Sequence, residues 1–380
     1  MRILHITPWY KPAYVYGGPI ESVSKLCESL AEAGHEIDVF TTTANGKEDL
    51  DVPIGNAVEL NGVSVYYFQR ITKDPTQVSP ALWSKLKKVH QNYDLVHIHS
   101  WWNPLAIISS YICNRNNVKV ILSPRGMLSD YIFNSGNSFI KKAIHRTFGK
   151  KLLSTTIFHA TSMAEYTECV NLINGWHGFV VPNILSLPFE INLRRKGNIF
   201  TLLYMSRIHP KKGLELLFKA VSKLEMNFVL KIAGLGDNNY IKELKDLAYK
   251  LGISSKIEWL GWKDRSQKFA IISNADLLVL TSANENFANI VVEALHMGTP
   301  VLLSEGVALS SYILEYNLGW VTSLDVHDVK IKIEEAYFDV EKRIQVNLNG
   351  RKIIDNSFSR EKLVNDYISN YQNIIDNKQP

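Results

Sequence analysis

The stretch Ser282-Ala-Asn-Glu-Asn-Phe-Ala-Asn-Ile-Val-Val-Glu-Ala-Leu-His-Met-Gly-Thr-Pro300 lies between two short apolar runs, Leu277–Leu280 and Val301–Leu303. Such runs are typical of buried strands in a parallel sheet, and the spacing of apolar residues between them indicates a helix. Gly298 and Pro300 stand where that helix is expected to end. The segment is therefore predicted to form a strand–helix–strand unit of an α/β fold.

Two carboxylates mark the predicted helix, Glu285 just before its start and Glu293 about two turns inside it. Asn289, Glu293 and His296 share one stripe of the helix. The opposite face is apolar and consists of Phe287, Ile290, Val291, Ala294 and Leu295. Backbone N–H groups at a helix start suit an anion, and carboxylates accept hydrogen bonds from sugar and ribose hydroxyls. The alternative is a solvated stripe on an amphipathic helix.

The length and composition favour a globular protein with two domains. The chain has 380 residues, of which 46% are hydrophobic and 21% are charged, and a formal net charge of +5. We find no secretory leader and no apolar run near the ~20 residues that span a bilayer. The three cysteines, Cys27, Cys113 and Cys169, are too far apart to suggest a disulfide framework or a zinc site. We therefore expect a cytoplasmic protein that does not bind nucleic acid.

Strands and helices alternate in both halves of the chain, which predicts two doubly wound, Rossmann-like α/β domains that face each other across a cleft. The first domain is expected at 1–183 and the second at 199–359, with a linker at 184–198. The final helix, from about Arg360 to Ile375, could cross back to the first domain. Ligands of such folds bind at the carboxyl ends of the strands.

Two cations and two glycine motifs occur where strands are expected to end. Arg207 and Lys212 flank a loop before a helix, where they could bind a diphosphate; the alternative is a pair of solvated loop charges. Gly17-Gly18-Pro19 would allow a ligand to approach a helix start closely, although it also suits a plain tight turn. Gly234-Leu-Gly236 lacks the remaining features of a dinucleotide fingerprint, so it suggests only a loop that lines a nucleotide pocket.

No pattern indicates a metal site. Asp49-Leu-Asp51 lies in a polar loop and is interpreted as a solvated turn. The histidines lack convincing metal-ligand spacing. His97 and His99 point to the same face of a predicted strand. His99, at the carboxyl end, could reach the cleft and an acceptor, whereas His97 is expected in the core.

A basic cluster stands out at Lys141-Lys142, Arg146 and Lys150-Lys151. It falls on a predicted helix together with the apolar residues Ile140, Ile144 and Phe148. Such a helix suits peripheral association with an anionic membrane, and an ordinary solvated face is the alternative.

The order of these motifs along the chain resembles that of the family-4 retaining glycosyltransferases of the GT-B fold. The resemblance implies metal-independent transfer from a nucleotide-sugar donor, without a cofactor, to an acceptor held mainly by the N-terminal domain. It implies that Arg207 and Lys212 bind the diphosphate and stabilise the leaving group, and that Glu285 holds the transferred sugar. It assigns donor binding to Gly18, Gly234, Phe287, Ala288, Asn289 and, at the ribose, Glu293.

The sequence departs from the commoner family pattern at Ser123-Pro-Arg-Gly-Met127, where Arg125 replaces a histidine. This version resembles a subgroup found in bacterial surface-polysaccharide synthesis. A guanidinium cannot act as a base, so the role that its chemistry allows Arg125 is electrostatic stabilisation.

The leading hypothesis is thus a retaining glycosyltransferase that acts on a saccharide or lipid-linked saccharide at the cytoplasmic face of the membrane. The alternatives are a nucleotide-sugar epimerase or a phosphorylase on a similar scaffold, and a non-catalytic subunit that binds a nucleotide-sugar. An epimerase would convert the donor without an acceptor, and a phosphorylase would need a pyridoxal-bearing lysine for which no site is recognisable.

Overall fold

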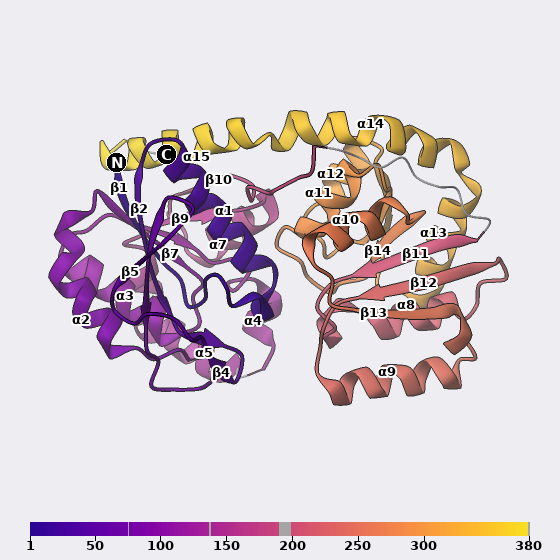
Figure 1. Cartoon of the computed structure of the whole chain (residues 1–380), viewed down its shortest axis with the longest axis horizontal. Helices are drawn as coiled ribbons and strands as arrows, with labels where there is room; N and C mark the ends of the chain where they lie inside the picture. The colour runs from indigo at the N-terminus through magenta and orange to yellow at the C-terminus, as the bar shows by residue number, and fades with distance from the viewer. Residues whose placement is uncertain (75, 137, 190–198, 379–380) are drawn as a thin grey trace. The chain divides into compact units, whose positions relative to one another are not determined.

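The computed structural model describes residues 1–74, 76–136, 138–189 and 199–378. The chain divides into two compact units: unit 1 contains 1–185 and 360–380, and unit 2 contains 186–359 (Figure 1). Most of the linker expected at 184–198 lies outside the described residues. Among the residues that are described, no helix is both long and apolar enough to cross a bilayer.

Unit 1 is built on an eight-stranded sheet with the order β10-β9-β8-β7-β1-β2-β6-β5. All neighbouring strands are parallel except β5, which pairs antiparallel with β6 at one edge. The strands are β1 (Arg2–Ile6), β2 (Glu36–Thr42), β5 (Ala57–Leu60), β6 (Val63–Phe68), β7 (Leu95–His99), β8 (Val120–Ser123), β9 (Ile157–Ala160) and β10 (Gly178–Val180). A short hairpin of β3 (Ala44–Asn45) and β4 (Glu48–Asp49) stands apart.

The helices of unit 1 connect these strands, and the last one comes from the C-terminus. They are α1 (Gly18–Glu32), α2 (Pro80–Val89), α3 (Pro104–Arg115), α4 (Asp130–Asn134), α5 (Ser138–Ile144), α6 (Lys150–Leu153), α7 (Met163–Leu172) and α15 (Arg360–Ile375). Helix α15 packs beside α1, and Arg360 Nε donates to Ser29 Oγ at 3.0 Å. Lys119 Nζ donates to the carbonyl of Ile374 at 2.9 Å near the end of α15. The C-terminal helix is therefore part of unit 1.

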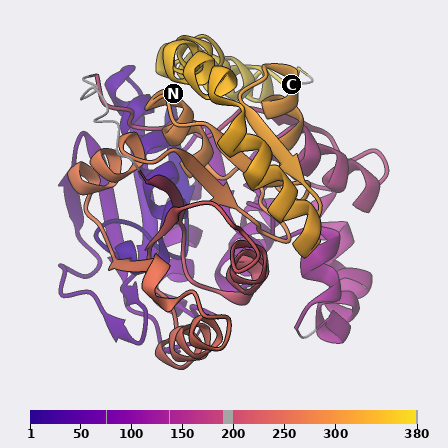
Figure 2. The same ribbon diagram turned by 90° about the vertical axis from the view of Figure 1, so that its right-hand side faces the viewer.

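Unit 2 contains a six-stranded, fully parallel sheet with the order β13-β12-β11-β14-β15-β16. The strands are β11 (Phe200–Met205), β12 (Phe228–Ala233), β13 (Ile257–Gly261), β14 (Leu277–Leu280), β15 (Val301–Ser304) and β16 (Gly319–Thr322). Helices cover both faces, with α8, α9 and α13 on one and α10, α11, α12 and α14 on the other (Figures 1 and 2). They are α8 (Leu214–Val221), α9 (Asn238–Lys250), α10 (Arg265–Ser273), α11 (Asn289–His296), α12 (Ser310–Glu315), α13 (Val326–Phe338) and α14 (Val340–Phe358).

The sequence prediction of two doubly wound α/β domains is confirmed. Helices on both faces bury the central strands of the two sheets, which explains their nearly continuous apolar runs. The apolar run Leu277–Leu280 forms strand β14 with the predicted bounds, and Val301–Leu303 forms all but the last residue of β15. Strands β5, β10 and β16 were not predicted; all three lie at sheet edges, and a run such as Gly319–Thr322 carries little periodicity.

Candidate functional site

In unit 2, the loops after β11 and β14 are joined by backbone contacts. Gly213 has a φ of 72°, and a Cβ built there would lie 2.1 Å from the carbonyl oxygen of Thr281. Thr281 Oγ1 donates to the carbonyl of Gly213 at 2.9 Å, and Ala283 N donates to that of Lys211 at 2.9 Å. Only glycine tolerates both the backbone conformation and the close approach. These contacts place Lys211 and Lys212 beside the segment that carries Glu285.

A third loop, after β12, lies against the same loop after β11. Gly234 has a φ of 146°, and a Cβ there would be 1.9 Å from the carbonyl oxygen of Ser206. At Gly236 a Cβ would lie 2.3 Å from the carbonyl oxygen of Ile208. The N–H of Ile208 donates to the carbonyl of Leu235 at 2.7 Å. Loop packing alone thus requires glycine at position 234, which sequence reasoning had explained by a ligand.

Glu285 is held by both its backbone and its side chain. Its N–H donates to the carbonyl of Gly306 at 2.8 Å, and its carbonyl accepts from Ala308 N at 3.0 Å. Its Oε1 accepts from Ser282 Oγ at 3.0 Å and forms an ion pair with Lys212 Nζ. Sequence reasoning proposed Lys212 and Glu285 separately, and the structure brings them into contact.

The loop that carries Lys212 is electropositive. Arg207, at the start of the loop after β11, is exposed, and Lys211 Nζ donates to Asn284 Oδ1 at 3.1 Å. Partial burial, together with the neighbouring cations Arg207, Lys211 and Lys212, lowers the pKa of His209. A loop with this charge suits an anionic group such as a diphosphate.

Helix α11 begins later than the sequence suggested. Ala288 is its N-cap, in the left-handed conformation with φ 63° and ψ 73°, so Glu293 is the fifth helical residue and lies just over one turn inside. The backbone N–H groups of Phe287 and Ala288 donate no hydrogen bond to any described residue. A left-handed alanine costs of order 1–3 kcal/mol and often marks a functional site. Unpaired amides at this helix start could meet a sugar or phosphate oxygen.

The polar stripe of α11 is buried, so the solvent-face interpretation is wrong for Glu293 and His296, which are 5% and 3% exposed. Glu293 Oε1 accepts from Lys268 Nζ at 2.7 Å. The ring nitrogens of His296 contact Asp355 Oδ1 at 3.0 Å and the carbonyl oxygen of Pro188 at 2.8 Å. Within unit 2, His296 therefore attaches α11 to α14 and to the segment before β11.

In unit 1, the candidates are Gly18, Arg125 and His99. Gly18 is the first residue of α1 and is exposed, after an N-cap at Gly17 with φ 72°. Arg125 has a φ of 53°, and its Nη1 donates to Ser22 Oγ in α1 at 3.1 Å and to Asn183 Oδ1 at 3.2 Å. The structure thus places Arg125 beside the N-terminal part of α1.

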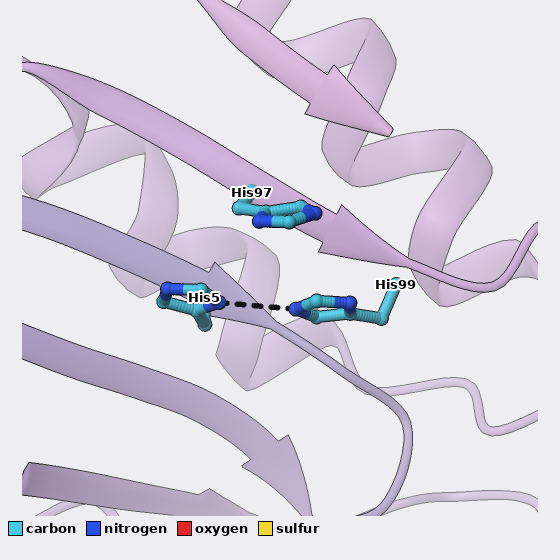
Figure 3. Close-up of side chains that lie close together, drawn as sticks. All are labelled: His5, His97 and His99. Atoms are coloured by element: carbon cyan, nitrogen blue, oxygen red, sulfur yellow. Dashed lines mark hydrogen bonds between the residues drawn. The ribbon is translucent and has the colours of Figure 1, made fainter. Parts of the chain in front are cut away.

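His99 is buried and contacts Arg125 from the side of the core. It is 1% exposed, so it cannot reach an acceptor directly as the sequence suggested. Arg125 Nε donates to His99 Nδ1 at 3.3 Å. Because arginine only donates, His99 must carry its proton on Nε2 and donate it to His5 Nδ1 at 3.0 Å (Figure 3). His99 and His5 therefore hold the Arg125 guanidinium from the side of the core.

A second hydrogen-bonded chain runs beside the first, and its proton positions also follow from one fixed partner. His159 Nε2 must donate to the carbonyl of Val181 at 2.8 Å, so its Nδ1 accepts from Ser123 Oγ at 2.6 Å. Ser123 Oγ in turn accepts from His97 Nε2 at 2.6 Å, and His97 Nδ1 accepts from the hydroxyl of Tyr371 at 2.6 Å. This chain connects α15 to three strands of the sheet, with every histidine neutral.

Three of these histidines are close enough to suggest a metal site, since ligand atoms of His5, His97 and His99 lie within 4.8 Å of one another. Their bonding argues against that reading, because both nitrogens of His97 are engaged by hydroxyls and His99 contacts a guanidinium. A cation there would face the charge of Arg125. The Asp-x-Asp letters form no metal site with other described residues either, since Asp49 Oδ1 accepts from Arg70 Nε at 2.7 Å.

Two doubly wound domains with parallel sheets, and a loop site at the strand ends, define the GT-B class of glycosyltransferases. Residues 16–185 match the Glycosyltransferase Family 4 domain, and residues 189–353 match the domain described as Glycosyl transferases group 1. The chain therefore belongs to the glycosyltransferases, with a family 4 domain followed by a group 1 domain.

Relatives in sequence agree with this assignment, and a solved structure agrees with the fold. An uncharacterized glycosyltransferase of Methanocaldococcus jannaschii is 27% identical, and the match covers 98% of each chain. The lipopolysaccharide core biosynthesis glycosyltransferase LpsE of Rhizobium meliloti is 26% identical over 43% of this chain and 47% of that protein. The structure of Anabaena HepE in complex with UDP and glucose has a TM-score of 0.75 at 19% identity, covering 98% of this chain and 99% of that one.

We predict that unit 1 loses stability when the pH falls below about 6.5, the usual histidine value. Burial, with a smaller effect of Arg125, lowers the pKa of His5 to about 3, and burial lowers that of His159 to about 3. The unfolded chain therefore binds more protons than the native one between these values, at up to ~1.4 kcal/mol per pH unit for each histidine.

Urea unfolding at pH 7.5 and 5.0 measures this effect, because few carboxylates titrate in that interval. His159→Gln should flatten the dependence, whereas the exposed His327→Gln in unit 2 should leave it unchanged. Equal unfolding midpoints at the two pH values in the unmodified protein would show that the histidine chains are not held neutral.

Proposed function

We propose that the chain is a retaining, metal-independent glycosyltransferase that moves a sugar from a nucleotide-sugar to a saccharide or lipid-linked saccharide in bacterial surface-polysaccharide synthesis. The observation that carries the proposal is the Lys212–Glu285 ion pair beside the open amides of Phe287 and Ala288. The relative from Rhizobium meliloti and the Anabaena complex with UDP and glucose support the acceptor and donor classes.

The cationic loop is suited to the leaving group. The acceptor hydroxyl oxygen bonds to the anomeric carbon on the same face from which the diphosphate oxygen departs, as retention requires, while the bond from that carbon to the diphosphate oxygen breaks. The electron pair stays on the diphosphate, and the hydroxyl proton leaves with it or to solvent. Arg207 and Lys212, together with the amides before α11, would stabilise the charge that develops there, which is the work that a metal performs elsewhere.

Lys212 forms an ion pair with Glu285, and both side chains are largely buried. A bound diphosphate would compete for Lys212, and the carboxylate of Glu285 would then be available to the hydroxyls of the transferred sugar. Glu293 would bind the ribose. In unit 1, Arg125 would act electrostatically, with Gly18 letting the loop before α1 approach the diphosphate.

The donor and the metal requirement can be tested together. The enzyme is incubated with a polysaccharide-derived acceptor and uridine, guanosine or thymidine diphosphate sugars, and nucleoside diphosphate release is followed with and without a chelator. We expect release with one donor class, unchanged by the chelator. Strict dependence on a divalent metal would contradict the mechanism, and a new sugar nucleotide formed without an acceptor would identify an epimerase.

We predict that Glu285→Gln lowers kcat more than it raises the donor KM, because Glu285 would contact the sugar as its bond breaks. A hydrogen bond to a charged group contributes roughly 1.5–3 kcal/mol, which corresponds to about ten- to a hundredfold in rate. Steady-state kinetics measures both constants, and Glu334→Gln, in the Lys330–Glu334 ion pair of α13, is the control. Unchanged kcat in a folded Glu285→Gln variant would remove Glu285 from the reaction.

Peripheral attachment to an anionic membrane is also part of the proposal. Phe139, Ile140 and Phe148 are 83%, 55% and 46% exposed on α5 and the π-helical turn that follows it, so the core does not claim them. Arg146, Lys150 and Lys151 lie beside them and are exposed. Such a basic and aromatic surface is complementary to anionic lipid headgroups.

Not every lysine of the cluster serves this surface. Lys141 Nζ donates to the carbonyls of Ile132 and Ser135 at 2.8 and 3.0 Å, where α4 ends, and Lys142 Nζ donates to Asn134 Oδ1 at 3.1 Å. Replacing these two lysines would disturb the local fold. A charge-reversal test should therefore spare them.

We predict that the variant Arg146→Glu/Lys150→Glu/Lys151→Glu loses binding to anionic vesicles at low salt, since each basic residue contributes about 1 kcal/mol. Flotation with vesicles containing phosphatidylglycerol measures binding, and Phe139→Ser should weaken it at every salt concentration. The variant Lys47→Glu/Lys87→Glu/Lys88→Glu has the same net charge and changes exposed residues elsewhere in unit 1. Equal flotation of the unmodified protein and the two triple variants would mean that the cluster is an ordinary solvated face.

A further inference from the structure

A buried ion pair connects α10 with α11 in unit 2. Lys268 Nζ lies 2.7 Å from Glu293 Oε1, and the side chains are only 17% and 6% exposed. Lys268 could not be identified as a site residue from the sequence, because lysines on amphipathic helices are usually solvated. Its partner is the carboxylate assigned above to the ribose.

The surroundings of the pair are rigid. Asp264 caps α10 by accepting from Gln267 N at 2.9 Å, and Thr299 Oγ1, just beyond α11, donates to the carbonyl of Ile272 near the end of α10 at 2.7 Å. Arg265 Nη2 donates to the carbonyl of Ser186 at 2.9 Å. Helix α10 is thus anchored at both ends, and its contact with the chain after α11 fixes the position of Lys268 relative to Glu293.

Burying a carboxylate as deeply as that of Glu293 costs free energy unless a positive charge compensates it. Removing one partner of a buried ion pair strongly destabilises the folded protein, because the other charge is left uncompensated. Left alone, the carboxyl would bind a proton or turn away from the interior, and in either case it would lose acceptor capacity. A cation that contacts one oxygen keeps the group ionised and in a single orientation.

We propose that Lys268 is a positioning residue that holds the Glu293 carboxylate ionised and oriented for the ribose hydroxyls of the donor. The inference rests on the proposed function, because it takes Glu293 as the ribose acceptor. Lys268 acts through Glu293 and need not touch the donor. The site therefore distinguishes ribonucleotides from deoxyribonucleotides by a carboxylate and lysine pair, not by the carboxylate alone.

Calorimetry tests this with UDP, GDP and ADP and their 2′-deoxy counterparts. The unmodified protein should bind at least one ribonucleoside diphosphate about tenfold or more above its 2′-deoxy form, the ratio expected for one hydrogen bond to a charged group. Glu293→Gln and Lys268→Met should both bring this ratio close to one. Lys268→Arg, which keeps the charge, should restore most of it, and the double variant Lys268→Met/Glu293→Gln should lose no more than either single variant.

The matched control is Lys330→Met, which breaks another lysine–glutamate pair of unit 2, 2.8 Å long but within α13 alone and less buried, with side chains 25% and 29% exposed. It should leave the ratio unchanged. Should Lys268→Met fail to fold, Lys268→Gln removes the charge with a smaller loss of hydrogen bonding and must still lower the ratio. A merely structural role would weaken both nucleotides equally.

The failures are distinguishable. If Glu293→Gln abolishes the preference for ribose but the Lys268 variants keep it, the positioning role is overturned while the proposed function stands. If Glu293→Gln keeps the preference, or if the unmodified protein binds no nucleoside diphosphate, the assignment of the site itself is wrong.

Discussion

The site in unit 2 depends on one steric constraint, the contact between the backbone at Gly213 and the carbonyl of Thr281. No side chain fits between these two loops, so the chain after β11 and the chain after β14 can lie against each other only with glycine at 213. The hydrogen bond from Ala283 N to the carbonyl of Lys211 extends the contact between the two loops by two residues on each side. As a result, Lys212 contacts Glu285, and the two charges are held in a fixed position, which is the arrangement that the proposed diphosphate site requires.

In unit 1, buried polar side chains rather than a backbone contact fix the position of the candidate site residue Arg125. Arg125 adopts a strained conformation, and its guanidinium is held by His99 on one side and by Ser22 and Asn183 on the other. Because arginine can only donate, it dictates the tautomers of the histidines behind it. The neighbouring series of hydrogen bonds, from Tyr371 to His159, attaches the C-terminal helix α15 to the sheet of this unit. Neutral histidines are thus the condition for both the position of Arg125 and the docking of α15.

The fold could be predicted from the sequence because its central strands are covered on both faces and therefore read as continuous apolar runs. Lys212 and Glu285 could each be proposed from the sequence because both follow strand ends of one sheet, but their direct contact could not be predicted. Three further things could not be read. Lys268 is 25 positions before Glu293 and looks like any helix lysine. His99 contacts Arg125, which is 26 positions away in the sequence, and the requirement for glycine at 234 arises from Ser206, a residue on another loop.

The central claim is that the loops after β11 and β14, with the start of α11, form the donor site. A crystal structure of the chain with a bound ribonucleoside diphosphate tests it most directly. We expect phosphate oxygens within hydrogen-bonding distance of Lys212 Nζ and the backbone N–H of Ala288, and ribose hydroxyls at Glu293. A nucleotide bound elsewhere, with Lys212 still paired to Glu285 and no ligand at α11, would contradict the account.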